Sequence, residues 1–163
     1  MASDLKNLSD VKQVKSGLKA NTKVAIVVAD WNQDITYALL EGAESFLLES
    51  GVKKQNIKVY HVPGTFELVL GAQLALKENV DGVICLGCVI QGDTPHFTFI
   101  CDATANGIMD LNIKHNKPFI FGVLTTLTLK QAKERCGGKH GNKGVEAAAT
   151  LLHMLALKNS IKK

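Results

Sequence analysis

The sequence of 163 residues has no apolar run of membrane-spanning length, and its first residues lack the apolar core of a signal peptide. We therefore expect a cytoplasmic protein without a membrane partner. The chain also has only a small excess of charge of one sign. The formal net charge is +4, and the lysines are scattered rather than gathered into a stripe with interleaved aromatic residues, which gives little support to nucleic-acid binding.

Cysteine is limited to four residues, of which Cys85 and Cys88 have the C-x-x-C spacing of some metal and redox sites. This pair falls inside an expected strand, where residues three positions apart point to opposite faces. The two thiols therefore cannot share a metal ion or readily form a disulfide, and no second Cys/His pair completes a zinc site. We expect structural thiols, no metal and a reducing compartment.

Apolar runs of strand length alternate with helical patterns along most of the chain. Strands are predicted at 24–29, 57–62, 82–88 and 118–124, and helices at about 34–50, 65–78, 95–115, 128–136 and 143–158. This alternation implies right-handed crossovers and a parallel sheet covered on both faces. We predict a single α/β domain over 22–160, a three-layer α/β/α sandwich with a four-stranded parallel, flavodoxin-like sheet. Residues 1–21 are expected to form an N-terminal arm that orders against a partner.

The most distinctive residues follow the ends of the predicted strands. They occupy four segments: 30–32, 63–67, 89–96 and the residues after Leu124. Open parallel sheets bind ligands beyond the carboxyl ends of their strands. The convergence of these four segments on one edge of the sheet therefore predicts a ligand site there.

The segment 92–96 has the chemistry of a reaction centre. Thr94 is a good N-cap residue, and Pro95 is favoured at the first position of a helix. The turn would present backbone N–H groups and a hydroxyl to a phosphate at a helix N-terminus. His96, one residue into that helix, is placed to exchange protons with a group bound in the turn, the alternative being a structural histidine. The other four histidines have no comparable setting.

Four further residues have both a structural and a functional interpretation. Trp31, the only tryptophan, is either a core aromatic or a flat surface for a heteroaromatic ring. Glu67 either compensates a helix dipole or, with the neighbouring hydroxyl of Thr65, holds a polyhydroxyl chain. Arg135 and Lys143 either lie on solvated faces or supply the cation that a phosphate needs.

Five segments then appear together in a specific order: 30–32, 62–67, 87–97, 121–125 and 141–144. Over about residues 21–158, the chain closely resembles the 6,7-dimethyl-8-ribityllumazine synthase family of riboflavin biosynthesis. The resemblance implies a transferase that condenses 5-amino-6-(D-ribitylamino)uracil with 3,4-dihydroxy-2-butanone 4-phosphate and releases orthophosphate and water. It implies no cofactor and no metal.

The resemblance also assigns residues to the ribitylaminouracil. Trp31 would stack on the pyrimidine ring, where many relatives carry phenylalanine. The ribityl chain would contact Thr65, Phe66 and Glu67. The uracil or its side chain would contact Cys88, Val89 and Ile90.

Other residues are assigned by the resemblance to the phosphorylated ketone and to the chemistry. Asp93 and Thr94 would form the phosphate-binding turn, with Arg135 as its cation. His96 would be the acid/base catalyst that assists Schiff-base formation and phosphate elimination. Phe121 and Lys143 match further site positions, and Phe121 and Arg135 would serve the pocket of an adjoining chain.

Two residues depart from the family pattern. Gln91 stands where many relatives carry arginine, and Asp93 where small residues are common. Binding of the phosphate by backbone N–H groups would tolerate both changes.

The resemblance further implies a homopentamer, since the family assembles in this form and some members build an icosahedral shell of sixty subunits. The short turn at 138–142 resembles the shell-forming members. Two other functions remain open. A riboflavin synthase of the same fold would dismutate two lumazines without releasing phosphate, and a non-enzymatic lumazine or flavin carrier would use Trp31 alone.

Overall fold

The computed structural model describes residues 7, 9–11 and 18–161. Its main sheet has four parallel strands, β1 (Val24–Ala29), β2 (Ile57–Val62), β3 (Gly82–Ile90) and β4 (Phe119–Thr126), in the order β2-β1-β3-β4. The helices are α1 (Gln33–Glu49), α2 (Leu68–Ala75), α3 (His96–His115), α4 (Leu129–Lys133) and α5 (Lys143–Ile161). Two short 3-10 turns, η1 (Lys54–Asn56) and η2 (Leu76–Glu78), and a hairpin of β5 (Cys136–Gly138) and β6 (Gly141–Asn142) complete the described elements.

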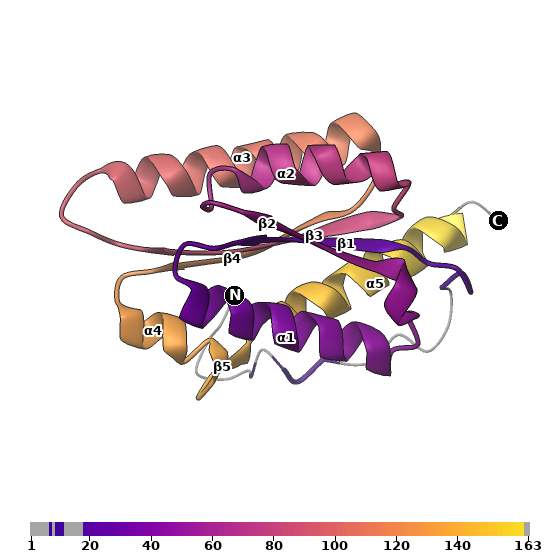
Figure 1. Ribbon diagram of the computed structural model, residues 1–163, viewed down its shortest axis with the longest axis horizontal. Helices are drawn as coiled ribbons and strands as arrows, with labels where there is room; N and C mark the ends of the chain where they lie inside the picture. The colour runs from indigo at the N-terminus through magenta and orange to yellow at the C-terminus, as the bar shows by residue number, and fades with distance from the viewer. Residues whose placement is uncertain (1–6, 8, 12–17, 162–163) are drawn as a thin grey trace.

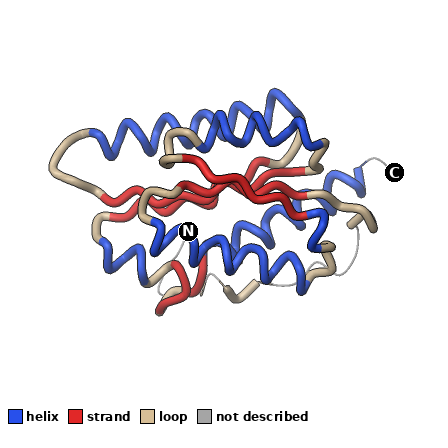
Figure 2. Tube along the Cα trace, in the orientation of Figure 1, coloured by secondary structure: helices blue, strands red, loops and turns tan. Residues whose placement is uncertain are grey.

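Helices cover both faces of the sheet, which confirms the predicted three-layer α/β/α sandwich (Figures 1 and 2). α2 and α3 lie on one face, and α1, α4 and α5 lie on the other. β1 and β3 are the inner strands, and the chain runs from β1 to the edge strand β2 before it returns to β3. The direction of winding therefore changes between β1 and β3, and this is where open α/β sheets form a ligand crevice.

Alternation along the strands divides the apolar core into two clusters. One cluster joins Val24, Ile26 and Val28 of β1 to apolar side chains of α1 and α5. The other joins Ala25, Val27 and Ala29 to side chains of α2 and α3. Both faces of β1 are therefore buried, which explains why its sequence is a continuous apolar run.

The same alternation separates the two cysteines of the C-x-x-C segment. Cys85 lies in the cluster with α2 and α3, and Cys88 lies in the cluster with α1 and α5. The pair therefore points to opposite faces, as the spacing predicts. Burial raises the pKa of each thiol to about 12, so both stay protonated near neutral pH.

Some predicted boundaries are wrong by a few residues. Positions 89 and 90, expected in a turn, belong to β3, because the ladder with β4 continues to the pair Ile90 and Thr126. The helix expected from Thr65 begins at Leu68, and the helix expected to reach position 136 ends at Lys133. The β5–β6 hairpin has no signal in the sequence, because strands of three and two residues are too short to show apolar alternation.

Part of the predicted N-terminal arm lies on the body of its own chain. Ser9 Oγ accepts a hydrogen bond of 2.9 Å from the backbone N–H of Asn142, and Val11 and Leu18 pack against the core cluster of α1 and α5. The other apolar positions of the arm, Leu5, Leu8 and Val14, lie outside the described residues. Ordering of the arm against a partner stays a prediction.

Candidate active site

A cavity of about 810 Å³ lies beyond the carboxyl ends of β1 and β3. Nine of the predicted site residues line it: Trp31, Thr65, Phe66, Glu67, Cys88, Val89, Ile90, Thr94 and His96. The other lining residues are Asn32, Pro63, Gly64, Gly92, Phe97 and Ile100. Three of the four segments predicted to converge at this edge of the sheet therefore line one cavity. The fourth, the residues after Leu124, does not line it.

Trp31 is 72% exposed and lines the cavity, so it is not a core aromatic. Its backbone N–H donates to the Pro63 carbonyl at 3.1 Å. The next residue, Asn32, has a left-handed φ of 62° and donates from Nδ2 to the Cys88 carbonyl at 2.9 Å. Bonds to two neighbouring strand ends thus hold the segment that presents the indole, and the exposed ring is available to stack on a planar ligand.

The turn between β2 and α2 forms another wall of the cavity. Thr65 is only 5% exposed, and its hydroxyl has no hydrogen-bond partner among the residues that the structure describes. A buried hydroxyl without a partner is destabilising, and a ligand group could satisfy it. Phe66 and Glu67 are exposed, and Glu67 makes no side-chain cap hydrogen bond to α2. Its carboxylate therefore remains available to hydroxyl groups of a ligand.

The end of β3 contributes Cys88, Val89 and Ile90. Cys88 is 1% exposed, and burial raises the pKa of its thiol, so it offers its backbone to a ligand rather than a reactive thiolate. Val89 and Ile90 are half-buried and add apolar surface. This strand end therefore suits the edge of a ring that hydrogen-bonds to backbone groups.

The N-terminus of α3 differs from the predicted cap. The helix begins at His96, its cap residue is Pro95 in a helical conformation, and no side chain caps it. Thr94 lies in the preceding turn, where its side chain lines the cavity instead of bonding to the helix. The N–H groups of a first helical turn have no carbonyl partners within the helix, so the cavity still borders a position that favours an anion.

Six lining residues were not predicted as site residues, and three of them contribute larger side chains: Asn32, Phe97 and Ile100. Ile100 follows His96 by four positions, so helical periodicity places it on the same side of α3, and this signal was present in the sequence. The bond from Asn32 to β3 depends on a left-handed backbone and on a partner 56 positions away. The tolerance of asparagine for that conformation is its only local signal.

Asp93 and Phe121 do not line the cavity of their own chain. Asp93 is exposed in the turn before α3. Phe121 lies within the edge strand β4, opposite Cys85, and its half-buried ring packs against the core cluster of α2 and α3. Phe121 therefore lies at an edge of the sheet and outside the cavity of its own chain.

Arg135 and Lys143 also lie away from the cavity. Arg135 follows α4 and donates from its guanidinium to the Gln131 carbonyl at 2.9 Å. Lys143 begins α5 and forms an ion pair of 3.0 Å with Glu146. Within the described part of the chain, no lysine or arginine lines the cavity. A phosphate bound there would have to take its cation from elsewhere.

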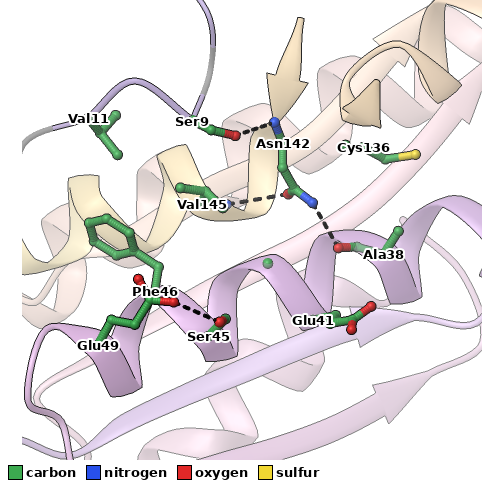
Figure 3. A pocket seen from close by; sticks show the side chains of 12 residues that line it. Ser9, Val11, Ala38, Glu41, Ser45, Phe46, Glu49, Cys136, Asn142 and Val145 are labelled. Carbon is green, nitrogen blue, oxygen red and sulfur yellow. Dashed lines mark hydrogen bonds between the residues drawn. The ribbon is translucent and has the colours of Figure 1, made fainter. Parts of the chain in front are cut away.

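A second hollow, of about 580 Å³, lies between α1, the β5–β6 hairpin and residues 9–11. Figure 3 shows that Asn142 bridges its walls, donating from Nδ2 to the Ala38 carbonyl at 2.9 Å and from its backbone N–H to Ser9. Glu41 and Glu49 line this hollow, and none of the predicted site residues does. Two carboxylates disfavour an anionic substrate, so the cavity at the strand ends is the candidate site.

Two glycines near the candidate site give a paired test of its packing. A Cβ at Gly87 would lie 2.8 Å from Thr65 Oγ1 and 2.9 Å from Leu68 Cδ1, whereas a Cβ at Gly92 would meet nothing within 4 Å. We expect Gly87→Ala to lower the free energy of unfolding by about 1–3 kcal/mol through overpacking. Gly92→Ala should change it by less than about 0.5 kcal/mol. Urea unfolding at one protein concentration measures both, and equal effects would contradict the packing.

The fold and the cavity define a class of α/β protein that binds a small molecule at the carboxyl edge of a parallel sheet. The chain belongs to the 6,7-dimethyl-8-ribityllumazine synthase family, whose model matches residues 21–159. The family predicted from the ordered segments is therefore confirmed, and with it the class of enzyme.

Relatives match the chain along nearly its whole length. The 6,7-dimethyl-8-ribityllumazine synthase of Cytophaga hutchinsonii is 58% identical over 157 residues, which cover 96% of this chain and 98% of the relative. The protein of the same name from Porphyromonas gingivalis is 52% identical over 158 residues, with the same two coverages. That of Parabacteroides distasonis is 49% identical over 158 residues, covering 95% of this chain and 98% of the relative.

No helix in the described part of the chain is long and apolar enough to cross a membrane. No three side chains of His, Cys, Asp or Glu gather there in a way that could hold a metal ion.

Proposed function

We propose that the protein condenses 5-amino-6-(D-ribitylamino)uracil with 3,4-dihydroxy-2-butanone 4-phosphate to 6,7-dimethyl-8-ribityllumazine, releasing orthophosphate, as a step of riboflavin biosynthesis. The observation that carries the proposal is that Trp31, the turn at 65–67 and His96 line one cavity. Relatives of nearly equal length that are named for this product support it.

The ribitylaminouracil fits the wall formed by β1, β2 and β3. The exposed ring of Trp31 stacks on the pyrimidine, and the backbone at the end of β3 bonds to its edge. The hydroxyl of Thr65, buried without a partner among the described residues, and the exposed carboxylate of Glu67 bind the ribityl chain. This placement leaves the 5-amino group to face the phosphorylated ketone.

The ketone phosphate fits the turn before α3, where Thr94 and the N–H groups of the helix start favour an anion. The 5-amino nitrogen attacks the ketone, and loss of water gives a Schiff base before phosphate departs. Both steps move protons, and His96 is the histidine at the cavity that can transfer them. Holding two reactants in attack geometry supplies roughly 7–11 kcal/mol of barrier reduction, so orientation contributes most of the rate.

The hydrogen bond of Gln91 indicates which part of the turn binds the phosphate. Its backbone N–H donates to the Thr126 carbonyl at 2.9 Å, and its side chain is exposed. The N–H of Gln91 is therefore already used, and the phosphate is bound by N–H groups closer to α3. The exposed side chains of Gln91 and Asp93 then affect the affinity for phosphate more than the activity.

The active unit that we propose is a homopentamer in which an adjoining chain completes each site. A phosphate needs a cation, and none lines the cavity in the described part of this chain, so Arg135 is assigned to the pocket of a neighbour. Phe121 is assigned to that neighbouring pocket as well, and Lys143 supports the same pocket. Exposed apolar side chains of α2 and α3 offer surface for subunit contacts. They are Leu70, Leu74, Phe99, Met109 and Ile113, each 49–75% exposed.

Some such pentamers close into a shell of sixty subunits, and the tight β5–β6 hairpin without an insertion favours that form here. The molar mass from light scattering separates pentamer from shell.

The division of the chain into an arm at 1–21 and a domain at 22–160 is supported by the start of the family match at residue 21. The cytoplasmic location stays a prediction.

The test of the proposed function mixes the purified protein with both substrates and follows lumazine absorbance and orthophosphate together. Equal amounts of the two products are expected. In a parallel reaction that supplies lumazine alone, formation of riboflavin without phosphate release would indicate the riboflavin synthase. Tight binding of lumazine without turnover would indicate the carrier, and would leave His96 and Arg135 without a function.

A further inference from the structure

Two side chains outside the cavity lining converge on one carboxylate oxygen of Asp30, at the carboxyl ends of β1 and β2. His61 Nδ1 lies 2.8 Å from Asp30 Oδ1, and the hydroxyl of Tyr37 on α1 donates to the same oxygen at 2.9 Å. An ionised carboxylate only accepts hydrogen bonds, so His61 is the donor. The rings of Tyr37 and His61 meet edge to face with their centroids 5.5 Å apart. We call these three residues the Asp30 cluster.

The Asp30 cluster is arranged for an ionised aspartate. Hydrogen bonds from His61 and then from Tyr37 lower the pKa of Asp30, and the bond to Asp30 raises the pKa of Tyr37. The carboxylate of Asp30 therefore stays ionised to a lower pH than usual. The phenol of Tyr37 stays protonated to a higher pH than usual. Exposed ion pairs of this kind contribute little to stability. Stability alone therefore does not explain a carboxylate held by two donors.

Asp30, the centre of the Asp30 cluster, directly precedes Trp31 in the chain. The N–H of Asp30 donates to the Val62 carbonyl at 2.8 Å and that of Trp31 to the Pro63 carbonyl at 3.1 Å, so the pairing of β1 with β2 continues past both strands. On the other side of Trp31, Asn32 donates to the end of β3. Trp31 thus stands between a residue tied to β2 and α1 and a residue tied to β3. Its 72% exposed ring gains little orientation from packing.

We infer that Asp30, His61 and Tyr37 are positioning residues that hold the Trp31 ring and the turn at 63–67 in the geometry that binds the pyrimidine. None of the three lines the cavity, so they act through the backbone of Trp31 and Pro63. The identity of the ring rests on the proposed function. The constraint on Trp31 is a property of the free protein.

Asp30→Ala is the direct test, because it removes the acceptor of both donors. Trp31 is the only tryptophan, so the fluorescence anisotropy decay of the protein reports the motion of this ring alone. We expect a larger fast component in the decay and a KM for the ribitylaminouracil raised about tenfold, as for the loss of one or two hydrogen bonds. The turnover number and the KM for the ketone phosphate should stay near their wild-type values.

Related variants make the test specific. Asp30→Asn keeps an acceptor oxygen and should restore part of both readouts, while His61→Ala and Tyr37→Phe, which each remove one donor, should have smaller effects. Glu44→Ala is the matched control, since it breaks another surface ion pair of α1, that of Glu44 with Lys54 at 3.3 Å. It should leave both readouts unchanged.

Two outcomes would overturn the inference. One is a wild-type anisotropy decay in Asp30→Ala. The other is an equal rise of both KM values with a lower unfolding midpoint, which would show general damage to the fold. Failure of the proposed function is distinguished from both, because the wild-type protein would then form no lumazine while the anisotropy of the free variants would still report on Trp31.

Discussion

Replacing His96 by alanine is expected to slow lumazine formation by about 10²–10⁴-fold, the usual contribution of a general acid or base. The KM values for both substrates and the unfolding midpoint should change little. His96 is exposed at the first position of α3, so its removal leaves no void in the core. Activity persists at a reduced rate because the orientation of the two reactants, which His96 does not provide, supplies roughly 7–11 kcal/mol.

Steady-state rates at saturating concentrations of both substrates measure the effect. His153→Ala is the matched control, since His153 is an exposed helical histidine on α5 and does not line the cavity. Complete loss of activity with an intact fold would contradict a mechanism dominated by orientation. An unchanged rate would remove His96 from the chemistry.

The sheet could be predicted from the sequence because each strand leaves a local signal. Burial on both faces makes β1 a continuous apolar run, and the helices of both layers show apolar periodicity. The ends of the strands and helices were harder to predict from the sequence. β3 extends to Ile90 because its ladder with β4 continues there, and that pairing joins residues 36 positions apart. The cap of α3 was predicted at Thr94, whose side chain lines the cavity instead.

The part of the candidate site that could be predicted is the part that lies at strand ends. Residues at 31, 65–67, 88–90, 94 and 96 come together because a parallel sheet brings the carboxyl ends of its strands to one edge. His61 was given no role, since its setting beside Asp30 and Tyr37 arises only when β1 and β2 pair and α1 packs beside them. Arg135 was assigned by family resemblance, and it does not line the cavity of its own chain.

Arg135→Ala is expected to raise the KM for the ketone phosphate by about ten- to a hundredfold, the loss that follows removal of a hydrogen bond to a charged group. The KM for the ribitylaminouracil should change much less. Lys133→Ala is the control, because it removes the same charge from an exposed position on the adjacent helix α4. An unchanged KM for the ketone phosphate in Arg135→Ala would remove Arg135 from the phosphate site.

Mixed assemblies of His96→Ala and Arg135→Ala chains decide which chain the arginine serves. If each site takes His96 from one chain and Arg135 from the next around a ring, random assembly of equal amounts leaves about a quarter of the sites with both residues intact. Co-refolded mixtures should then regain about a quarter of the wild-type rate at a low concentration of ketone phosphate, where each pure variant is weak. If Arg135 instead served the cavity of its own chain, no site in any mixture would hold both residues. The mixture would then be no faster than the average of the two variants, and the site would lie within one subunit.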